Sequence, residues 1–122
     1  MSGKRPLGAA YLSSFCMEMS LILKAGINLG DGISMLAEDE SDRYIKSVLT
    51  EIKSGIGRGK TAHKTFSDIR IFPKYMVDMI EIGEKTGNLE KVFSSLSEYF
   101  KRQEWISKSL RNAVVYPAVL LF

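Results

Sequence analysis

Apolar residues recur along this chain at intervals of three and four, the spacing that places side chains on one face of an α-helix. The pattern predicts a first helix that begins near Leu12 and ends at Gly26, because glycine readily adopts the left-handed conformation that ends a helix. A short helix over residues 29–37 and a longer one over residues 45–56 follow. The apolar stripes of these three helices are Leu12, Phe15, Cys16, Met19, Ile22 and Leu23; Leu29, Ile33, Leu36 and Ala37; and Ile45, Val48, Leu49, Ile52 and Ile56.

Three more helices are predicted in the second half of the chain. A short one spans Thr61 to Ser67, Pro73 stands in the first turn of the next, where proline is favoured, and the last begins near Asn88. The acidic run at 38–42 is expected to be a solvated turn that contains a helix N-cap. No stretch alternates with a period of two and no Pro- or Ser-rich linker divides the chain, so the predicted fold is all-α, a compact antiparallel bundle of about six helices. The stripes of the last two helices are Met76, Met79, Ile80 and Gly83, and Leu89, Val92, Phe93, Leu96, Tyr99 and Phe100.

The final residues differ in kind from the rest. From Ala113 the sequence runs AVVYPAVLLF without a charge, and such a helical run spans about 15 Å, roughly half the hydrocarbon core of a bilayer. We interpret residues 112–122 as the truncated start of a first transmembrane helix, after a short tail over 1–11 and a cytoplasmic bundle over 12–111; a buried core helix is the alternative. A basic flank precedes the run, as the positive-inside rule expects on the cytoplasmic side. It comprises Lys101, Arg102, Lys108 and Arg111 against Glu104.

Composition adds little to this interpretation. The chain has 122 residues, 45% hydrophobic and 25% charged, which is typical of one globular domain. Its formal net charge of +3 is mild and its basic residues are spread out, so charge alone does not indicate a nucleic-acid binder. Cys16 is the single cysteine, and its apolar neighbours predict a buried structural thiol.

The stretch SGIGRGKT, residues 54–61, ends like a phosphate-binding loop. That loop needs glycine at the position occupied by Ser54, and Gly55 lies one place out of register. A phosphate loop also joins a buried strand to a helix, whereas an amphipathic helix precedes these glycines. We therefore interpret the glycines as a helix stop, Lys60 as a solvated residue and Thr61 as a helix cap.

Other candidate chemistry is equally weak. GEKTG at 83–87 has no lysine after its second glycine, so Gly83 is predicted to be a close helix contact and Gly87 a turn between helices. His63 is the only histidine and is expected to be solvated, which leaves no partner for a nucleophile relay or a His-based zinc site. The chain is predicted not to be an enzyme, with no catalytic or cofactor-binding residues. The charged-turn residues that lack the spacing of a calcium loop are Asp39, Glu40 and Asp42.

Three segments together resemble the F-domain of bacterial type II secretion and type IV pilus assembly systems, an inner-membrane platform protein. They are FCMEMSLILKAGINLGDGISML at 15–36, FPKYMVDMIEIGEKTGNLEKVF at 72–93 and NAVVYPAVLLF at 112–122. The order and spacing of Ala-Gly-x-x-Leu, Gly-Glu-x-x-Gly-x-Leu and Tyr-Pro carry the resemblance, which covers about residues 12–122. The matching positions are Gly26, Gly83, Glu84, Gly87, Leu89, Tyr116 and Pro117.

The resemblance implies the first of two six-helix cytoplasmic domains, at the cytoplasmic face of the bacterial inner membrane. It implies a scaffold that contacts a cytoplasmic assembly ATPase and couples it to pilin or pseudopilin subunits. The resemblance implies a homo-oligomer, for which a dimer is one possibility, and attachment to the membrane. It does not imply binding to nucleic acid. The alternative that the residues leave open is a small soluble helical regulator or a DNA-binding module that uses the basic residues of the last helix.

The resemblance also bears on single residues. Glu84 is expected to cap or pair locally, although in some relatives this carboxylate contributes to a calcium site at a dimer interface. Pro117 is expected to kink the helix near the membrane. Met17 and Glu18 stand where many relatives have Arg-Gln, so a contact that needs those side chains is not expected to carry over. The calcium would need further oxygens from Asp78, Glu81 or Thr86 of either chain.

Overall fold

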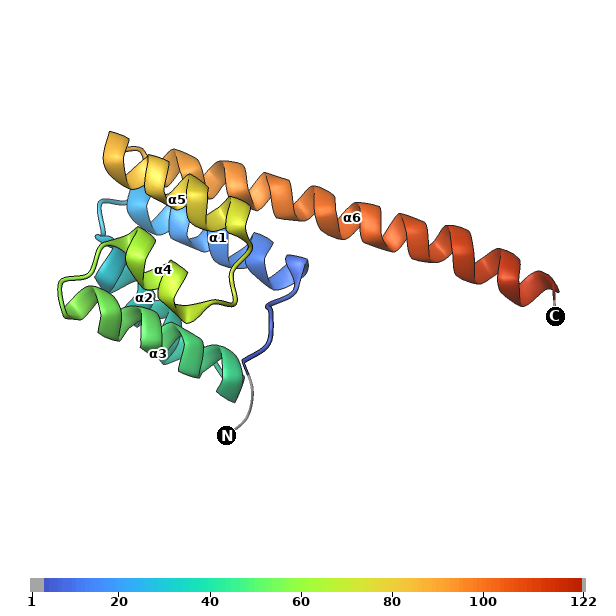
Figure 1. Cartoon of the computed structure of the whole chain (residues 1–122), viewed down its shortest axis with the longest axis horizontal. Helices are drawn as coiled ribbons and strands as arrows, with labels where there is room; N and C mark the ends of the chain where they lie inside the picture. Colours follow the sequence, from blue (N-terminus) through green and yellow to red (C-terminus); the bar gives the residue numbers. More distant parts are fainter. Residues whose placement is uncertain (1–3, 122) are drawn as a thin grey trace.

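The computed structural model describes the backbone of residues 4–121 and the side chains of residues 4–113. Every regular element in this part of the chain is an α-helix, which confirms the all-α prediction and the expected six helices (Figure 1). The helices are α1 (Ala9–Lys24), α2 (Leu29–Asp39), α3 (Arg43–Gly57), α4 (Ala62–Ile69), α5 (Lys74–Thr86) and α6 (Leu89–Leu121).

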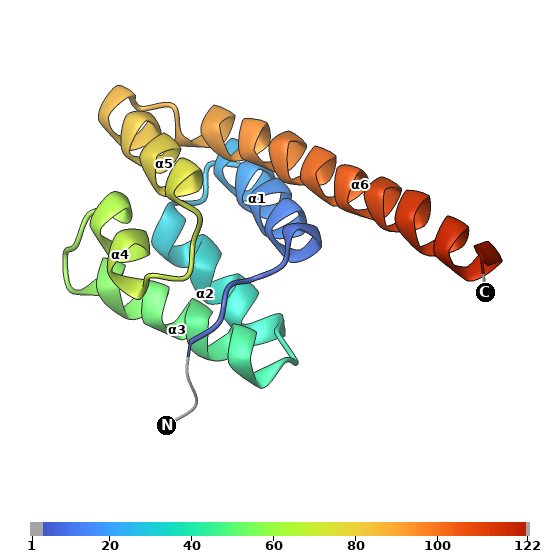
Figure 2. The ribbon, with the colours of Figure 1, turned by 45° about the vertical axis from the view of Figure 1, so that its right-hand side comes forward.

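The six helices form a closed ring. Each helix packs against its neighbours in sequence, and α6 returns to α1, with which it has the most extensive contact of all. Figures 1 and 2 show α1, α5 and α6 together on one side of the bundle and α2, α3 and α4 on the other. The first and the last helix of the chain are therefore packed against each other.

Small polar side chains let α1 and α6 approach closely. The Ser13 hydroxyl donates to the carbonyl oxygen of Ser97 and the Ser97 hydroxyl donates to that of Ser13, each at 3.0 Å. The Ser20 hydroxyl, two turns further along α1, donates to the carbonyl oxygen of Glu90 at 3.1 Å. Ser20 stands seven residues after Ser13 on α1, and its partner Glu90 stands seven residues before Ser97 on α6. The two helices are therefore antiparallel, and their contacts repeat every seven residues.

The centre of the core is aromatic. Phe15 of α1, Phe66 of α4 and Phe93 of α6 are fully buried, and the Phe15 ring centroid lies 6.2 Å from that of Phe66 and 6.1 Å from that of Phe93. The ring of Phe72 packs edge-on against Phe66 at 4.9 Å. Helices that are distant in sequence thus share one apolar centre, which large side chains fill to the density that stability requires.

Side chains cap the N-termini of three helices. Asn28, Asp42 and Thr61 cap α2, α3 and α4, each accepting a hydrogen bond from the backbone N–H three residues later. The acidic run at 38–42 therefore contains the expected N-cap. Gly26, with φ 89°, follows α1 in the left-handed conformation that the sequence predicts.

Most helix bounds differ from the prediction by a few residues, and Pro73 and Gly55 have other positions in their helices than predicted. Pro73 is the N-cap of α5, so it stands one place before the first turn. Gly55 belongs to α3, which runs on to Gly57, and only Gly59, with φ 89°, takes the left-handed conformation beyond it. The reason is packing, because a Cβ at Gly55 would lie 2.8 Å from Cγ2 of Thr65 on α4. Gly55 is therefore a helix contact and not a helix stop.

The last helix extends far beyond the bundle. It has 33 residues, and its second half projects away from the other helices in Figure 1. We call residues 105–121 the α6 stem. Among the helices that the structure describes, none combines the length and the apolar character that crossing a bilayer requires. The motif residues Tyr116 and Pro117, and most of the predicted membrane segment at 112–122, lie outside the described side chains.

Candidate functional site

The carboxylate of Glu84 reaches from α5 to the beginning of α4. Its Oε2 accepts a hydrogen bond of 2.7 Å from the backbone N–H of Ala62, and its Oε1 accepts one of 3.1 Å from that of His63. Thr61 Oγ1 accepts from the backbone N–H of Lys64 at 3.0 Å. The N–H groups of the first turn, which have no partner within a helix, are all satisfied, and the negative charge faces the positive end of the helix dipole.

The glycines around Glu84 fix the corner between α5 and α6. A Cβ at Gly83 would lie 2.7 Å from Val92 Cγ2 and 3.3 Å from the Cα of Leu89, so only glycine lets the two helices meet here. Gly87, with φ 70°, turns the chain in the left-handed conformation. These are the close contact and the turn that the sequence predicts for the two glycines, and together they hold Glu84 in place.

The same corner explains why SGIGRGKT is not a phosphate-binding loop. The helix that follows this stretch is α4, and the carboxylate of Glu84 already occupies the N–H groups on which a phosphate would lie. Lys60 is not simply solvated, since its Nζ lies 2.9 Å from Oδ2 of Asp68. Hydrogen bonds from Lys60 and Lys64 hold the pKa of the Asp68 carboxyl below its usual value.

The residues grouped with Glu84 as possible calcium ligands have other partners. Asp78 Oδ2 lies 2.7 Å from Nζ of Lys74, and Glu81 Oε2 lies 3.6 Å from Nδ1 of His63. Over the part of the chain that the structure describes, no three His, Cys, Asp or Glu side chains gather as a metal site would require. Calcium at Glu84 stays a prediction that needs oxygens from elsewhere, such as a second chain.

The segment before α1 is fastened to α3. The backbone N–H of Arg5 donates to the Tyr44 hydroxyl at 2.8 Å, and that hydroxyl donates to the carbonyl oxygen of Arg5 at 2.6 Å. The Arg5 guanidinium lies 3.9 Å from the centre of the Tyr44 ring, and Lys4 pairs with Glu51 at 3.1 Å. Periodicity could not reveal this strap, because its partners lie about 40 residues apart along the chain.

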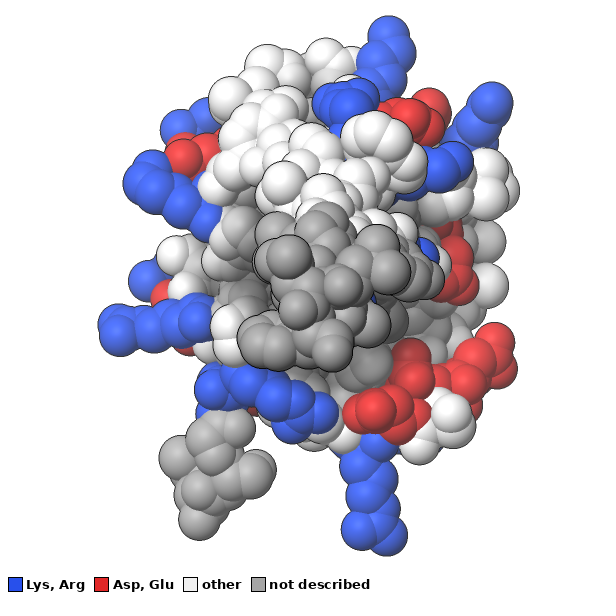
Figure 3. Space-filling view, turned by 90° about the vertical axis from the view of Figure 1, so that its right-hand side faces the viewer, with Lys and Arg blue, Asp and Glu red and all other residues white. Residues whose placement is uncertain are grey.

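Charge is unevenly distributed over the surface. Figure 3, which looks along the molecule from the end of the stem, shows Asp and Glu side chains gathered at the lower right, and Lys and Arg side chains along the left edge, at the upper right and at the bottom. The basic side chains do not form one continuous patch on this face.

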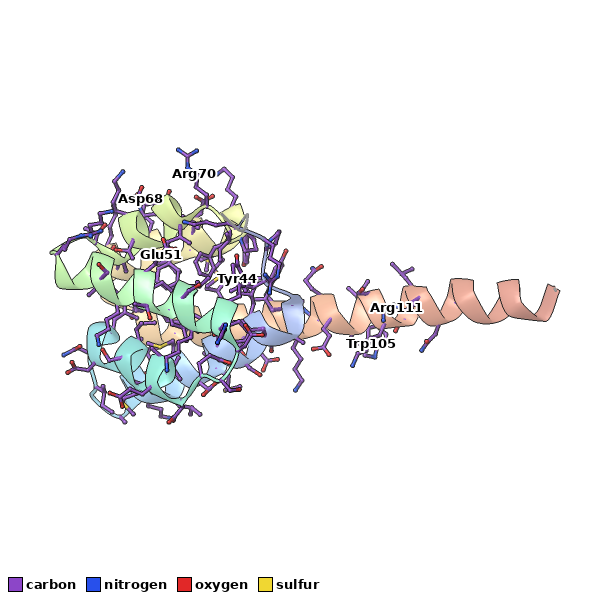
Figure 4. All side chains as sticks on the ribbon, turned by 90° about the horizontal axis from the view of Figure 1, so that it is seen from below. Tyr44, Glu51, Asp68, Arg70, Trp105 and Arg111 are labelled. Atoms are coloured by element: carbon purple, nitrogen blue, oxygen red, sulfur yellow. The ribbon has the colours of Figure 1, made fainter. Side chains whose placement is uncertain are left out.

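The α6 stem is amphipathic over its described side chains. Trp105, Ile106 and Leu110 are exposed, with 69% of Trp105 accessible, and helical spacing places them on one side of α6. Lys108 and Arg111 lie on the other side, where Lys108 pairs with Glu104 at 3.0 Å. Figure 4 shows that Trp105 and Arg111 lie on the part of α6 beyond the bundle. The stem thus has an apolar side and a charged side over its described side chains.

Comparison with known proteins relates the chain to secretion and pilus assembly. A family model described as "Type II secretion system (T2SS), protein F" matches residues 15–122. The type II secretion system protein F of Vibrio cholerae is 24% identical over 119 residues, and the type IV pilus assembly protein PilC of Thermus thermophilus is 21% identical over 117 residues. The protein transport protein HofC homolog of Escherichia coli is 27% identical over 107 residues.

The three alignments include nearly all of this chain but only a part of each relative. They cover 97%, 96% and 85% of the chain in the order given, against 29%, 29% and 26% of the relatives. The chain therefore spans less than a third of the length of the curated relatives that it matches.

Proposed function

Because this chain belongs to the family of type II secretion system protein F, we propose that it is a helical scaffold domain in the assembly of a secretion or pilus machine. The match over residues 15–122 carries the proposal. The relatives are named for secretion, pilus assembly and protein transport, which is consistent with a role without catalysis.

The proposed partners are a cytoplasmic assembly ATPase and the pilin or pseudopilin subunits that it drives into place. A scaffold between them must pass on movement, and α6 suits this task. Its buried residues Phe93 and Leu96 fix it in the core, and the same helix continues without a break into the stem. Since a packed core moves as a unit, displacement of the bundle would move the stem with it.

The proposed location is the cytoplasmic face of the bacterial inner membrane. The basic side chains Lys101, Lys108 and Arg111 precede the uncharged run at 113–122, an order that favours a cytoplasmic position for the basic residues. The part of the stem before residue 112 would then hold the bundle away from the lipid surface, where the ATPase can reach it.

Co-purification tests the proposal. The tagged chain is co-expressed with the assembly ATPase of the same organism and, as a control, with an unrelated hexameric ATPase. We expect elution and chemical crosslinking with the assembly ATPase alone. Absence of both at low and at physiological salt would count against the role. Salt-sensitive binding to DNA in its place would favour the nucleic-acid alternative.

A further inference from the structure

A shallow groove runs along the surface where α1 and α2 meet. Figure 2 shows the two helices next to each other, and they are in direct contact. Ile22 and Leu36 are half-buried, whereas the other lining residues of the groove are exposed. The groove is lined by Glu18, Leu21 and Ile22 of α1 and by Met35, Leu36 and Asp39 of α2.

Large apolar side chains stand exposed along this groove. Leu21 is 57% and Met35 46% accessible, one on each helix that lines the groove. Large apolar side chains that are exposed close to one another are typical of an interaction surface. Met35 can adapt its shape to a partner.

Carboxylates border both sides of the apolar strip. Glu18 comes from α1 and Asp39 from α2, and neither forms an ion pair within residues 4–113. Their charges therefore remain free to meet basic groups of a partner.

The acidic side of α2 also works against the stability of the helix. Asp39 is its last residue and Glu40 its C-cap, and no basic residue stands in its last turn. A negative charge at a helix C-terminus opposes the helix dipole and is therefore unfavourable. Glu40 has a local partner, since its Oε2 accepts a hydrogen bond of 3.1 Å from the backbone N–H of Asp42, so a basic partner would relieve chiefly the charge of Asp39.

We infer that this groove, between Glu18 and Asp39, docks an amphipathic helix of a partner protein that carries a row of aliphatic side chains flanked by lysine or arginine. The apolar strip accepts the aliphatic row, and the two carboxylates meet the basic flanks. Nucleic acid and anionic lipid are repelled by the same carboxylates. The inference rests on the proposed function only in that a scaffold must dock other proteins.

A pair of synthetic peptides tests the groove on the 122-residue chain. Both are fluorescent helices of about 14 residues with leucines at the same positions, and one has lysine where the other has glutamate. Fluorescence anisotropy at about 0.15 M salt is expected to show that the lysine peptide binds at least about tenfold more tightly.

Variants assign that binding to the groove. Glu18→Lys together with Asp39→Lys should reverse the preference between the peptides, and Leu21→Ser with Met35→Ser should weaken both. Glu51→Lys with Glu98→Lys changes the net charge equally on α3 and α6 and should leave the preference unchanged. Circular dichroism establishes that each variant keeps its helices.

Three results would overturn the inference. The first is equal binding of both peptides, and the second is a reversed preference in the Glu51→Lys and Glu98→Lys variant as well. The third is a concentration-dependent dimer in sedimentation that Leu21→Ser dissociates, because that result assigns the groove to a second copy of the chain. Co-purification with the ATPase is independent of these results. Failure of the groove and failure of the proposed function are therefore distinguishable.

Discussion

Glu84 and Ala62 are joined by a hydrogen bond of 2.7 Å that links two helices across 22 residues of sequence. The acceptor stands in the last turn of α5, and the donor is the first residue of α4. A helix of eight residues is marginal by itself, since nucleation costs more than so few backbone hydrogen bonds return. The cap from α5 therefore ties the formation of α4 to the packing of its neighbour.

Substitution of Glu84 should destabilise the domain through this cap. Glu84→Ala leaves the N–H groups of Ala62 and His63 without their charged acceptor, and we expect the free energy of unfolding to fall by about 2 kcal/mol. Glu84→Gln keeps one acceptor oxygen and should lose about half as much. Urea unfolding followed by circular dichroism measures both.

Glu81→Ala is the matched control on the same helix. The Glu81 side chain is 38% exposed and makes longer ion contacts with His63 and Lys85, at 3.6 Å and 3.4 Å. Exposed ion pairs contribute little, so its loss should cost less than about 1 kcal/mol. Equal losses for the two alanine variants would contradict a specific role for the cap.

Gly83→Ala should destabilise the corner between α5 and α6. The new methyl group would lie 2.7 Å from Val92 Cγ2 and 3.3 Å from the backbone of Leu89, so we expect a loss of about 1–3 kcal/mol in thermal or urea unfolding. Gly57→Ala, at the end of α3, meets nothing within 4 Å and should be neutral or stabilise by up to about 1 kcal/mol.

A double variant shows whether the contact with Val92 is the cause. Val92→Ala removes Cγ2 and should itself destabilise the core, because Val92 is buried. Combined with Gly83→Ala, it should cost less than the two single changes together, with a coupling of about 1 kcal/mol. Additive losses would instead place the strain at the backbone of Leu89.

The helices could be predicted from the sequence because their determinants are local. An apolar stripe with a period near 3.6 defines each helix, and short polar residues or glycine mark the ends, as at Asp42 and Gly26. Gly55 misled the prediction for a physical reason. Because Gly55 has no side chain, Thr65 of α4 can pack closely against it. A local sequence pattern cannot distinguish a glycine needed for such a contact from a glycine that ends a helix.

Pairings between distant residues could not be predicted in the same way. Periodicity shows that α1 and α6 each have a buried face, but the exchange of hydrogen bonds between Ser13 and Ser97 depends on how the ring closes. Likewise, the sequence predicts that Glu84 caps or pairs locally, whereas it caps α4 through Ala62, 22 residues away, a partner that follows only from the tertiary fold. The family motif thus gave the position of the residue but not its contacts.

Arg70→Gly should stabilise the domain. Arg70 ends α4 with φ 63°, the only described non-glycine residue in the left-handed region, and its side chain is exposed. Relief of this backbone strain is worth about 1–2 kcal/mol, part of which is offset by the greater freedom of glycine in the unfolded chain. We expect a net gain of about 0.5–1 kcal/mol in urea unfolding.

Arg58→Gly is the control for that gain. Arg58 is also an arginine at a helix end, but its φ of −89° suits any residue. The substitution should therefore be neutral or destabilising, because it adds only unfolded-state freedom. A similar gain at both positions would mean that loss of positive charge, and not backbone strain, is responsible.

Cys16 should make the domain sensitive to alkali. Its side chain is fully buried, and burial raises the pKa of the thiol from 9.0 to about 12. Between these values the unfolded chain has lost the thiol proton and the folded chain retains it. Stability is thus complete below about pH 9 and falls as the pH rises, by at most about 1.4 kcal/mol for each pH unit from this group.

Urea unfolding at about pH 8, 9 and 10 measures this slope, in a range below the ordinary pKa of lysine and at or below that of tyrosine. Cys16→Ala lowers stability at every pH because it leaves a small cavity, but it removes the thiol and should therefore show a shallower decline. Ellman's reagent should label the folded chain slowly and the urea-unfolded chain at once, since only the thiolate reacts. Equal pH slopes for the two proteins, or fast labelling of the folded chain, would show that the thiol ionises without unfolding.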